Sequence, residues 1–378
     1  MKTIGIIGGG QLGLMLIEQA HILGAKTICL DPTPDAPAFK ISDEHIVANF
    51  DDAQALEELC RRSDIVTYEF ENVPGDLLIS LEKHIKQGVR PLFDSQDRVR
   101  EKNNARENGL ETVNFAEVND MNSLVEGVKK IGYPCVFKTR TLGYDGHGQV
   151  VLKSDADLEK ASAYLPIPAI LEEFIPFDFE ASIVMVSDGK KIINFPIPQN
   201  IHTSGILDLS IVPEHCNNTP VRAGTAGADL QSVPHPALTK KIETLSKDFM
   251  RRCGYKGILT IEFFIKGDKV YFNEMAPRPH NSGHYTIEGC NTNQFMELCR
   301  FLLDMDLQEP KLLAPTIMKN ILGQDLEVAK QIAKENHPNV YVHIYGKIES
   351  KPKRKMGHIT FVGMDIDEYN EKWKHRFY

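Results

Sequence analysis

Residues 257–284 read GILTIEFFIKGDKVYFNEMAPRPHNSGH, and this stretch says most about the fold of the chain. Apolar and polar residues alternate on both sides of Gly267-Asp268, which is the pattern of two β-strands joined by a tight hairpin turn. Pairing across this turn lets Glu262 and Glu274 project from neighbouring strands to one face of the sheet. We therefore expect two carboxylates side by side.

The same stretch supplies further polar groups beside these carboxylates. Two glutamates and the amide oxygen of Asn273 are hard oxygen ligands of the kind that Mg²⁺ bound to phosphates requires. Most glutamates on strands face water, so the pair alone is not informative. The segment 277–284, PRPHNSGH, would crowd one spot with polar side chains, and this favours a site with Glu262 and Glu274 as metal ligands.

The chain opens with a strand, a glycine turn and a helix. Residues 2–7 and 26–30 are apolar runs, and residues 11–23 have apolar positions at helical spacing. Strands and helices continue to alternate up to about residue 97, with a helix expected over 76–87. This pattern predicts a parallel sheet with covered faces, which is an α/β arrangement.

The glycine turn GGGQLG at residues 8–13 fits the G-x-G-x-x-G pattern of dinucleotide-binding folds, and Asp31 follows where an acid could meet a ribose. The same turn serves any junction between a strand and a helix. Nothing downstream supplies a hydride-transfer site. A nicotinamide-binding oxidoreductase therefore stays an alternative.

The middle of the chain changes pattern. Residues 98–109 and 121–131 read as helices, and short β-like segments separated by turn residues follow them, which predicts an antiparallel α+β region. The prolines at 310 and 315 predict a linker before a small terminal unit.

Lys138 stands at the end of one β-like segment and precedes a loop with glycines at 143, 146 and 148. One fixed cation and a flexible flap of backbone amides can cover a polyphosphate. A solvated hairpin loop is the alternative. Glycines that cost chain entropy and bring no packing favour the phosphate interpretation.

The densest positive cluster is KPKRK at residues 351–355, close after Lys347. Such a run is also typical of a nuclear signal or a solvated turn. In a chain with a net charge of −9, we expect this cluster to hold a phosphate on a small substrate. Arg354 would offer a fork of donors and Lys347 a point charge.

Composition limits the function further. A chain of 378 residues is long enough for two or three domains, and its net negative charge opposes a general affinity for nucleic acid or anionic membrane. No apolar run has the length of a membrane span, and the opening residues do not read as a signal peptide. The seven cysteines form no C-x-x-C pair. We expect a cytoplasmic protein with reduced thiols.

Three runs together resemble the ATP-grasp superfamily and, within it, the N5-carboxyaminoimidazole ribonucleotide synthetase family of purine biosynthesis. These runs are YEFENVP at 68–74, GYDGHGQ at 143–149 and NEMAPRPHNSGH at 273–284, and the resemblance extends from Gly8 to His358. It implies an ATP-grasp fold and a homodimer. The domains it implies are an N-terminal Rossmann-like preATP-grasp domain at 1–97, a central ATP-grasp domain at 98–314 with a mobile lid at about 120–195, and a small C-terminal domain at 315–378.

The resemblance also implies a nucleotide site in which Arg98 and Lys138 contact phosphates, the glycine loop folds over them, and Mg²⁺ lies on Glu262 and Glu274. The residues implied to bind ATP are Arg98, Lys138, Gly143, Tyr144, Asp145, Gly146, His147, Gly148, Gln149, Glu172, Glu173, Phe174, Ile175, Glu180, His202, Asn273 and Glu274. The segment from Glu172 to Ile175 would hold the adenine edge, and Glu180 the ribose.

The implied reaction joins bicarbonate, ATP and 5-aminoimidazole ribonucleotide. Bicarbonate attacks the γ-phosphate to give carboxyphosphate, and the exocyclic amine of the ribonucleotide captures this compound or the CO₂ it releases. Water would destroy the mixed anhydride, so a closing lid is expected. The implied catalytic residues are Asp145 as proton acceptor, with His280 or a water as alternatives, Arg278 at the carboxylate, and Lys347. The implied substrate-binding residues are Glu71, Tyr144, His280, Lys347 and Arg354.

Another ATP-grasp ligase, such as a formate-dependent ribonucleotide transformylase or a biotin carboxylase component, would share the nucleotide site. The runs YEFENVP and YGK…RKMGH do not belong to the patterns of these relatives. Under the resemblance, the N-terminal glycine turn lies on the amine-substrate side and binds no nicotinamide.

Overall fold

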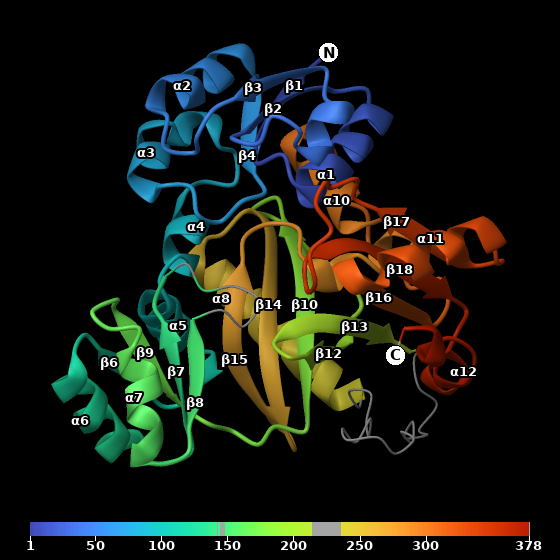
Figure 1. The fold of residues 1–378 in the computed structure, drawn as a ribbon. Coiled ribbons are helices and arrows are strands. Elements are labelled where there is room, and N and C mark those ends of the chain that lie inside the picture. Colours follow the sequence, from blue (N-terminus) through green and yellow to red (C-terminus); the bar gives the residue numbers. More distant parts are fainter. Residues whose placement is uncertain (142, 144–147, 214–235, 378) are drawn as a thin grey trace.

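The computed structural model describes residues 1–141, 143, 148–213 and 236–377, and these form three sheets with their covering helices (Figure 1). Among the described residues, no helix is long and apolar enough to cross a bilayer.

The first sheet is parallel, with strand order β3-β2-β1-β4. Its strands are β1 (Thr3–Ile7), β2 (Lys26–Asp31), β3 (Glu44–Val47) and β4 (Ile65–Tyr68), and the helices of this part are α1 (Gln11–Ile22), α2 (Ala53–Arg62), α3 (Gly75–Ser80) and α4 (Arg90–Ser95). The predicted helix over 76–87 is wrong in extent, because α3 ends at Ser80 and a 3₁₀ turn covers Glu82–His84. The apolar residues of this segment still face inward, since Leu78, Leu81 and Ile85 are all buried in one core.

The central sheet has the order β17-β18-β16-β13-β12-β10-β14-β15-β5, and β11 pairs with β10. Its strands are β5 (Glu111–Thr112), β10 (Phe179–Ser187), β11 (Ile192–Asn194), β12 (Gln199–Thr203), β13 (Ile206–Val212), β14 (Gly257–Lys266), β15 (Lys269–Ala276), β16 (Thr316–Leu322), β17 (Val340–Ile344) and β18 (Lys355–Val362). Helices α5 (Arg98–Glu107) and α8 (Pro236–Cys253) share an apolar core with every second residue of β10 and β14. Because strand side chains alternate, Glu180 and Glu262 project to the opposite face.

The terminal strands β16, β17 and β18 extend this central sheet, because β16 pairs with β13. The expected terminal unit therefore has no separate sheet among the described residues. Helices α11 (Leu326–Glu335) and α12 (Ile366–Lys372) pack on these strands, while α9 (Thr286–Gly289) and α10 (Gln294–Leu302) precede them. Helix α10 packs against α1, which ties the first sheet to the central one.

The third sheet is small and antiparallel, with order β6-β9-β7-β8. Its strands are β6 (Phe115–Val118), β7 (Cys135–Thr139), β8 (Gln149–Leu152) and β9 (Ala169–Glu173), and its helices are α6 (Met121–Ile131) and α7 (Leu158–Ser162). The expected lid range of about 120–195 includes β10 and β11 as well, and these two strands pair inside the central sheet and not in this one.

Gly13 allows α1 to begin close against the strand that precedes it. A Cβ atom at this position would lie 2.6 Å from the carbonyl oxygen of Gly8, which is backbone and cannot turn away. We predict that Gly13→Ala lowers the free energy of unfolding by about 1–3 kcal/mol, the usual cost of overpacking. Ile22→Ala, at the exposed end of the same helix, should change it by less than about 0.5 kcal/mol. Urea unfolding followed by circular dichroism compares the two, and equal losses would contradict the close approach.

Candidate active site

The hairpin of β14 and β15 sets Glu262 and Glu274 side by side, as predicted. These two residues are register partners in the antiparallel pair, so their side chains share one face at about 5 Å between Cβ atoms. The turn at Gly267-Asp268 closes the hairpin, with Gly267 at a φ of 58°. A bulge directly after Glu262 shifts the register of the rest of the strand.

The two carboxylates have different surroundings, which shift their pKa values in opposite directions. Glu274 Oε2 accepts a hydrogen bond from Arg98 Nη1 at 2.9 Å, and against the opposing effect of burial this cation holds the pKa of Glu274 below its usual range. Burial, followed by the charge of Glu274, raises the pKa of Glu262 to about 8. A cation near both oxygens would stabilise the doubly ionised pair.

His280 contacts Glu262 as a neutral imidazole. Its Nδ1 accepts a hydrogen bond from the backbone N–H of Ser282 at 3.3 Å, so the proton belongs on Nε2, which lies 3.1 Å from Glu262 Oε1. Burial, and then the nearby Arg278, hold the pKa of His280 well below its usual range. His280 therefore lies beside Glu262 as a neutral ring, with its Nε2 proton on that side, and does not form a charged pair with it.

A series of buried hydrogen bonds fixes this imidazole. Ser210 Oγ donates to Asn200 Oδ1 at 3.0 Å, Asn200 Nδ2 donates to Ser182 Oγ at 2.8 Å, and Ser182 Oγ donates to Ser282 Oγ at 2.7 Å. The hydroxyl of Ser282 lies 2.8 Å from Nδ1 of His280. These side chains lie on β13, β12, β10 and the segment after β15, so the central sheet itself orients His280.

Glu180 and His202 lie on the other side of Glu262. His202 Nδ1 is 2.7 Å from Glu180 Oε2, and although burial opposes it, the glutamates around the ring raise the pKa of His202 to about 9. One ligand atom from each of Glu180, His202 and Glu262 falls within 4.8 Å of the others. Two residues predicted for the nucleotide pocket thus meet one of the predicted metal ligands.

The oxygen atoms around the hairpin fit a hard divalent cation such as Mg²⁺. Glu262 and Glu274 offer carboxylates, and Asn273 Oδ1 is buried without a hydrogen-bond partner among the described residues. A buried oxygen that lacks a partner is costly, and a cation or a ligand donor would satisfy it. The imidazole of His202 is a softer ligand that suits Mg²⁺ less well than these oxygens.

Lys138 and Glu172 lie on neighbouring strands of the small sheet, β7 and β9. Lys138 Nζ donates to Glu172 Oε2 at 2.8 Å, and Lys102 Nζ of α5 lies 3.2 Å from Glu172 Oε1. Although burial opposes it, the two ammonium groups lower the pKa of Glu172 to about 2. Because two lysines hold this carboxylate, only the backbone of Glu172 is available for the role expected at the adenine edge.

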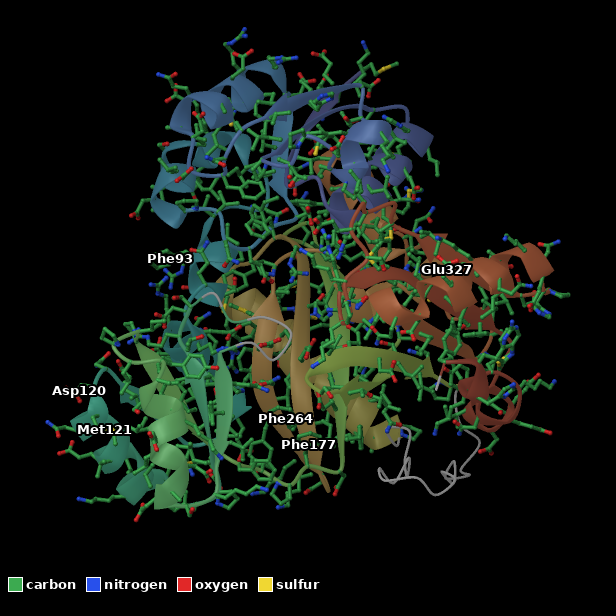
Figure 2. All side chains as sticks on the ribbon, viewed as in Figure 1. Phe93, Asp120, Met121, Phe177, Phe264 and Glu327 are labelled. Carbon is green, nitrogen blue, oxygen red and sulfur yellow. The ribbon has the colours of Figure 1, made fainter. Side chains whose placement is uncertain are left out.

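The segment after Glu172 joins the small sheet to the central sheet. Glu173 Oε2 accepts from Asn114 Nδ2 at 2.7 Å, while Phe174 is exposed. Phe177 stacks on Phe264 of β14 with ring centroids 4.6 Å apart, and both rings are labelled in Figure 2. The far end of this connection is therefore attached to the strand that carries Glu262.

The glycine loop is described only at its two ends. Gly143, Gly148 and Gln149 are described, whereas the predicted residues Tyr144, Asp145, Gly146 and His147 lie outside the described residues. Gly148 has a φ of 75°, and a Cβ there would lie 2.5 Å from Thr139 Oγ1. This end of the loop therefore requires glycine.

Arg278, Glu71 and Lys347 gather near the N-terminal glycine turn. Arg278 Nη2 lies 2.9 Å from Glu71 Oε1. Burial raises the pKa of the neighbouring Glu69 to about 7, while the amide of Gly10 and the charges of Arg278 and Lys347 act in the opposite direction. Residues from three separate motifs of the sequence thus meet in one place.

Arg354 does not join this group. Its side chain is exposed, and Nη1 donates to the carbonyl oxygen of Glu349 at 3.0 Å within the loop before β18. Lys347 Nζ donates to the carbonyl oxygen of Lys355 at 2.8 Å. The structure thus brings Lys347 toward Arg278 and keeps Arg354 on the surface.

The interpretation of the glycine turn as a dinucleotide site is not supported. Asp31 Oδ2 accepts from the backbone N–H of Gly9 and Glu69 Oε1 accepts from that of Gly10, each at 2.8 Å. Asp31 is buried and also accepts from Thr33 N, so it does not face a ribose site. Carboxylates of the protein already hold the amides that a pyrophosphate would need.

Sequence reasoning missed Lys102 and Glu101, which are both buried in α5. Glu101 Oε1 accepts from the backbone N–H of Met275 at 2.6 Å, and Lys102 Nζ donates to the carbonyl oxygen of Asn273 at 3.0 Å. The available signal was the composition of α5, whose buried apolar side chains are only Val99 and Ala105. A helix with so little apolar surface must use charged groups in its contact with the sheet.

Comparisons with known proteins identify the domains of the chain. A model of the ATP-grasp domain matches residues 103–295, a model of the ribonucleotide synthetase preATP-grasp domain matches residues 1–95, and a model of the phosphoribosylaminoimidazole carboxylase C-terminal domain matches residues 316–372. The chain is therefore an ATP-grasp enzyme, which confirms the predicted fold class.

Relatives that align with nearly the whole chain identify the family within this class. The N5-carboxyaminoimidazole ribonucleotide synthase of Staphylococcus haemolyticus is 39% identical over 372 residues, covering 97% of this chain and 94% of its own. A crystal structure of an N5-carboxyaminoimidazole ribonucleotide synthetase with ADP aligns with a TM-score of 0.90 at 39% identity and covers 99% of this chain and 96% of that one. The Aspergillus clavatus synthase in complex with ADP and 5-aminoimidazole ribonucleotide aligns with a TM-score of 0.86 at 28% identity, covering 99% and 97%. The chain belongs to the N5-carboxyaminoimidazole ribonucleotide synthase family.

The different environments of the two carboxylates predict opposite effects on stability. The pKa of Glu262 is about 8 in the folded chain and ordinary in the unfolded chain, so stability falls as pH rises through that interval. Glu262→Gln should therefore raise the melting temperature by a few degrees at pH 9 and very little at pH 5, without divalent cations. Glu274→Gln should lower it at both pH values, because Arg98 loses its partner. Scanning calorimetry at the two pH values is the test, and a gain from Glu274→Gln would contradict it.

Proposed function

We propose that the chain catalyses the ATP- and bicarbonate-dependent carboxylation of 5-aminoimidazole ribonucleotide, giving N5-carboxyaminoimidazole ribonucleotide, ADP and phosphate in purine biosynthesis. The observation that carries this proposal is the pairing of Glu262 and Glu274, with Arg98 on one side and His280 on the other. Membership of the family and the relatives that bind ADP, ATP and the ribonucleotide support it.

On the nucleotide side, Lys138 and Arg98 would place positive charge against the phosphates, and the loop from Gly143 to Gln149 would cover them. Glu262 and Glu274 would hold Mg²⁺, which supplies charge neutralisation at the phosphates when bound. Glu180 and His202 already form a polar pair beside Glu262, where they would meet the nucleotide. The backbone from Glu172 to Ile175 would hold the adenine edge, next to the connection attached by Phe177.

On the acceptor side, Arg278 would bind the carboxylate being transferred, and Glu71 would orient its guanidinium through the observed ion pair. Neutral His280 would position substrate with its one N–H, at Nε2, which lies beside Glu262. Asp145 would accept the proton of the amine, with Tyr144 beside it. Lys347 and Arg354 would hold the ribonucleotide phosphate, and Arg354 must leave its present bond to the backbone of Glu349 to do so.

We further propose a cytoplasmic homodimer. The six cysteines in the described part of the chain are free, which fits a reducing compartment. Light scattering on the purified chain measures its molar mass in solution and so tests whether it is a dimer.

The reaction predicts that phosphate release requires three substrates together. Release should need ATP, bicarbonate and 5-aminoimidazole ribonucleotide, and omitting any one should reduce the rate to background. A coupled phosphate assay with each substrate omitted in turn measures this. Replacing the ribonucleotide by formate with its own acceptor, or by biotin, should give no release, and turnover with either would favour another ATP-grasp ligase.

Arg278 should matter for the acceptor and not for ATP. Arg278→Lys keeps the charge but loses the planar fork, so we predict a fall in kcat/KM for the ribonucleotide on the order of a hundredfold, similar to the loss of one preorganised donor. The KM for ATP should change less than about threefold. Arg300→Lys, on α10, serves as a matched control and should leave both parameters unchanged. An equal loss for ATP and acceptor would remove Arg278 from the acceptor site.

A further inference from the structure

Lys102 is a lysine with no exposed surface at the meeting point of three elements. It extends from α5, contacts Glu172 of β9 at 3.2 Å, and donates to the carbonyl oxygen of Asn273 on β15 at 3.0 Å. Its Nζ also lies 5.8 Å from the centre of the Phe272 ring. Burying an ammonium group is costly unless it is paired, so a local role must offset this cost.

Glu172 is shared between two lysines that differ in their freedom. The side chain of Lys102 is fully enclosed, whereas that of Lys138 is 11% exposed. Lys138 stands at the end of β7, where the glycine loop begins, and so can turn toward a ligand. Lys102 has no such path.

The ion pairs around these residues are complete without a ligand. Arg98 pairs with Glu274, and Lys102 and Lys138 share Glu172. Burial, and then the charge of Glu274, raise the pKa of the neighbouring Glu101 well above its usual range. A triphosphate that takes Lys138 away from Glu172 would break one of these ion pairs. The buried carboxylate would then depend on its other partner.

We propose that Lys102 is a positioning residue for the nucleotide, because it stays on Glu172 as a permanent counter-charge and so lets Lys138 exchange this carboxylate for a phosphate of ATP. The proposal rests on the phosphate contact of Lys138 in the proposed function. Without Lys102, the same movement would leave Glu172 buried and unpaired. Lys138 would then remain on Glu172, and the nucleotide would lose its cation.

A double-mutant cycle tests this idea, with ADP and ATP affinities measured by calorimetry in the presence of Mg²⁺ and without the other substrates. Lys102→Met should weaken nucleotide binding at least tenfold. Glu172→Gln keeps the backbone proposed at the adenine edge and leaves Lys138 no carboxylate to leave, so its affinity is the reference for the cycle. The double variant should return to within threefold of Glu172→Gln, because no buried charge then lacks its partner.

Lys319→Met is the matched control. Lys319 is buried like Lys102 but lies on β16 of the central sheet. Its Nζ donates to Asp208 Oδ1 of β13 at 2.5 Å. Its loss should reduce thermal stability as the loss of Lys102 does. Nucleotide affinity should stay unchanged, which separates a general effect of losing a buried ion pair from the specific one.

Several results would overturn the role of Lys102. Nucleotide binding of Lys102→Met at the original affinity is one, and failure of Glu172→Gln to rescue it is another, because a purely structural role predicts that the two losses add. If Lys102→Met does not fold, the double variant carries the test, and binding tenfold weaker than Glu172→Gln would contradict the proposal. A different result would refute the proposed reaction alone. In that case the original chain binds nucleotide and Glu172→Gln rescues Lys102→Met, but no carboxylation occurs.

Discussion

The antiparallel pairing of Glu262 with Glu274 imposes a repulsion that the rest of the site must accommodate. Two carboxylates at this separation cannot both ionise cheaply in a buried setting. Arg98 favours the ionised form of Glu274, while burial and that negative charge raise the pKa of Glu262 to about 8. The pair is therefore suited to a cation, because a bound divalent ion would offset the burial and the repulsion that raise the pKa of Glu262.

The local parts of this architecture could be predicted from the sequence, since they depend on neighbouring residues. The hairpin, its two-residue turn and the shared face of the two glutamates follow from alternation around Gly267-Asp268. The β-α-β unit at the start of the chain follows from the same reasoning. The sheet to which a strand belongs cannot be predicted in this way, because the pattern of a β-strand does not specify the strand that it pairs with. For this reason the sequence does not show that β10 and β11 belong to the central sheet, or that β16 extends it.

Buried charges escaped prediction for another physical reason. A lysine or glutamate on a helix usually faces water, and the composition of α5 does not say which of its charged residues lie inside. Their burial depends on partners from β9 and β15, which lie far away in the sequence. Asp31 shows the converse, because a residue expected to face a ligand instead accepts hydrogen bonds from the glycine turn itself. Motif spacing identifies chemical groups, but only the packed structure shows which groups are already engaged.

Two kinds of polar network meet at the carboxylate pair, and they differ in how easily they can change. From Ser210 to His280, each donor in the series has one acceptor, so turning one group requires the others to turn as well. Around Glu172, one carboxylate serves two lysines, so one partner can leave while the other remains. The first network lies on the central sheet and holds the imidazole beside Glu262. The second involves the small sheet, which carries the glycine loop, and a shared charge is the arrangement that allows this side to rearrange around a phosphate without disturbing the other.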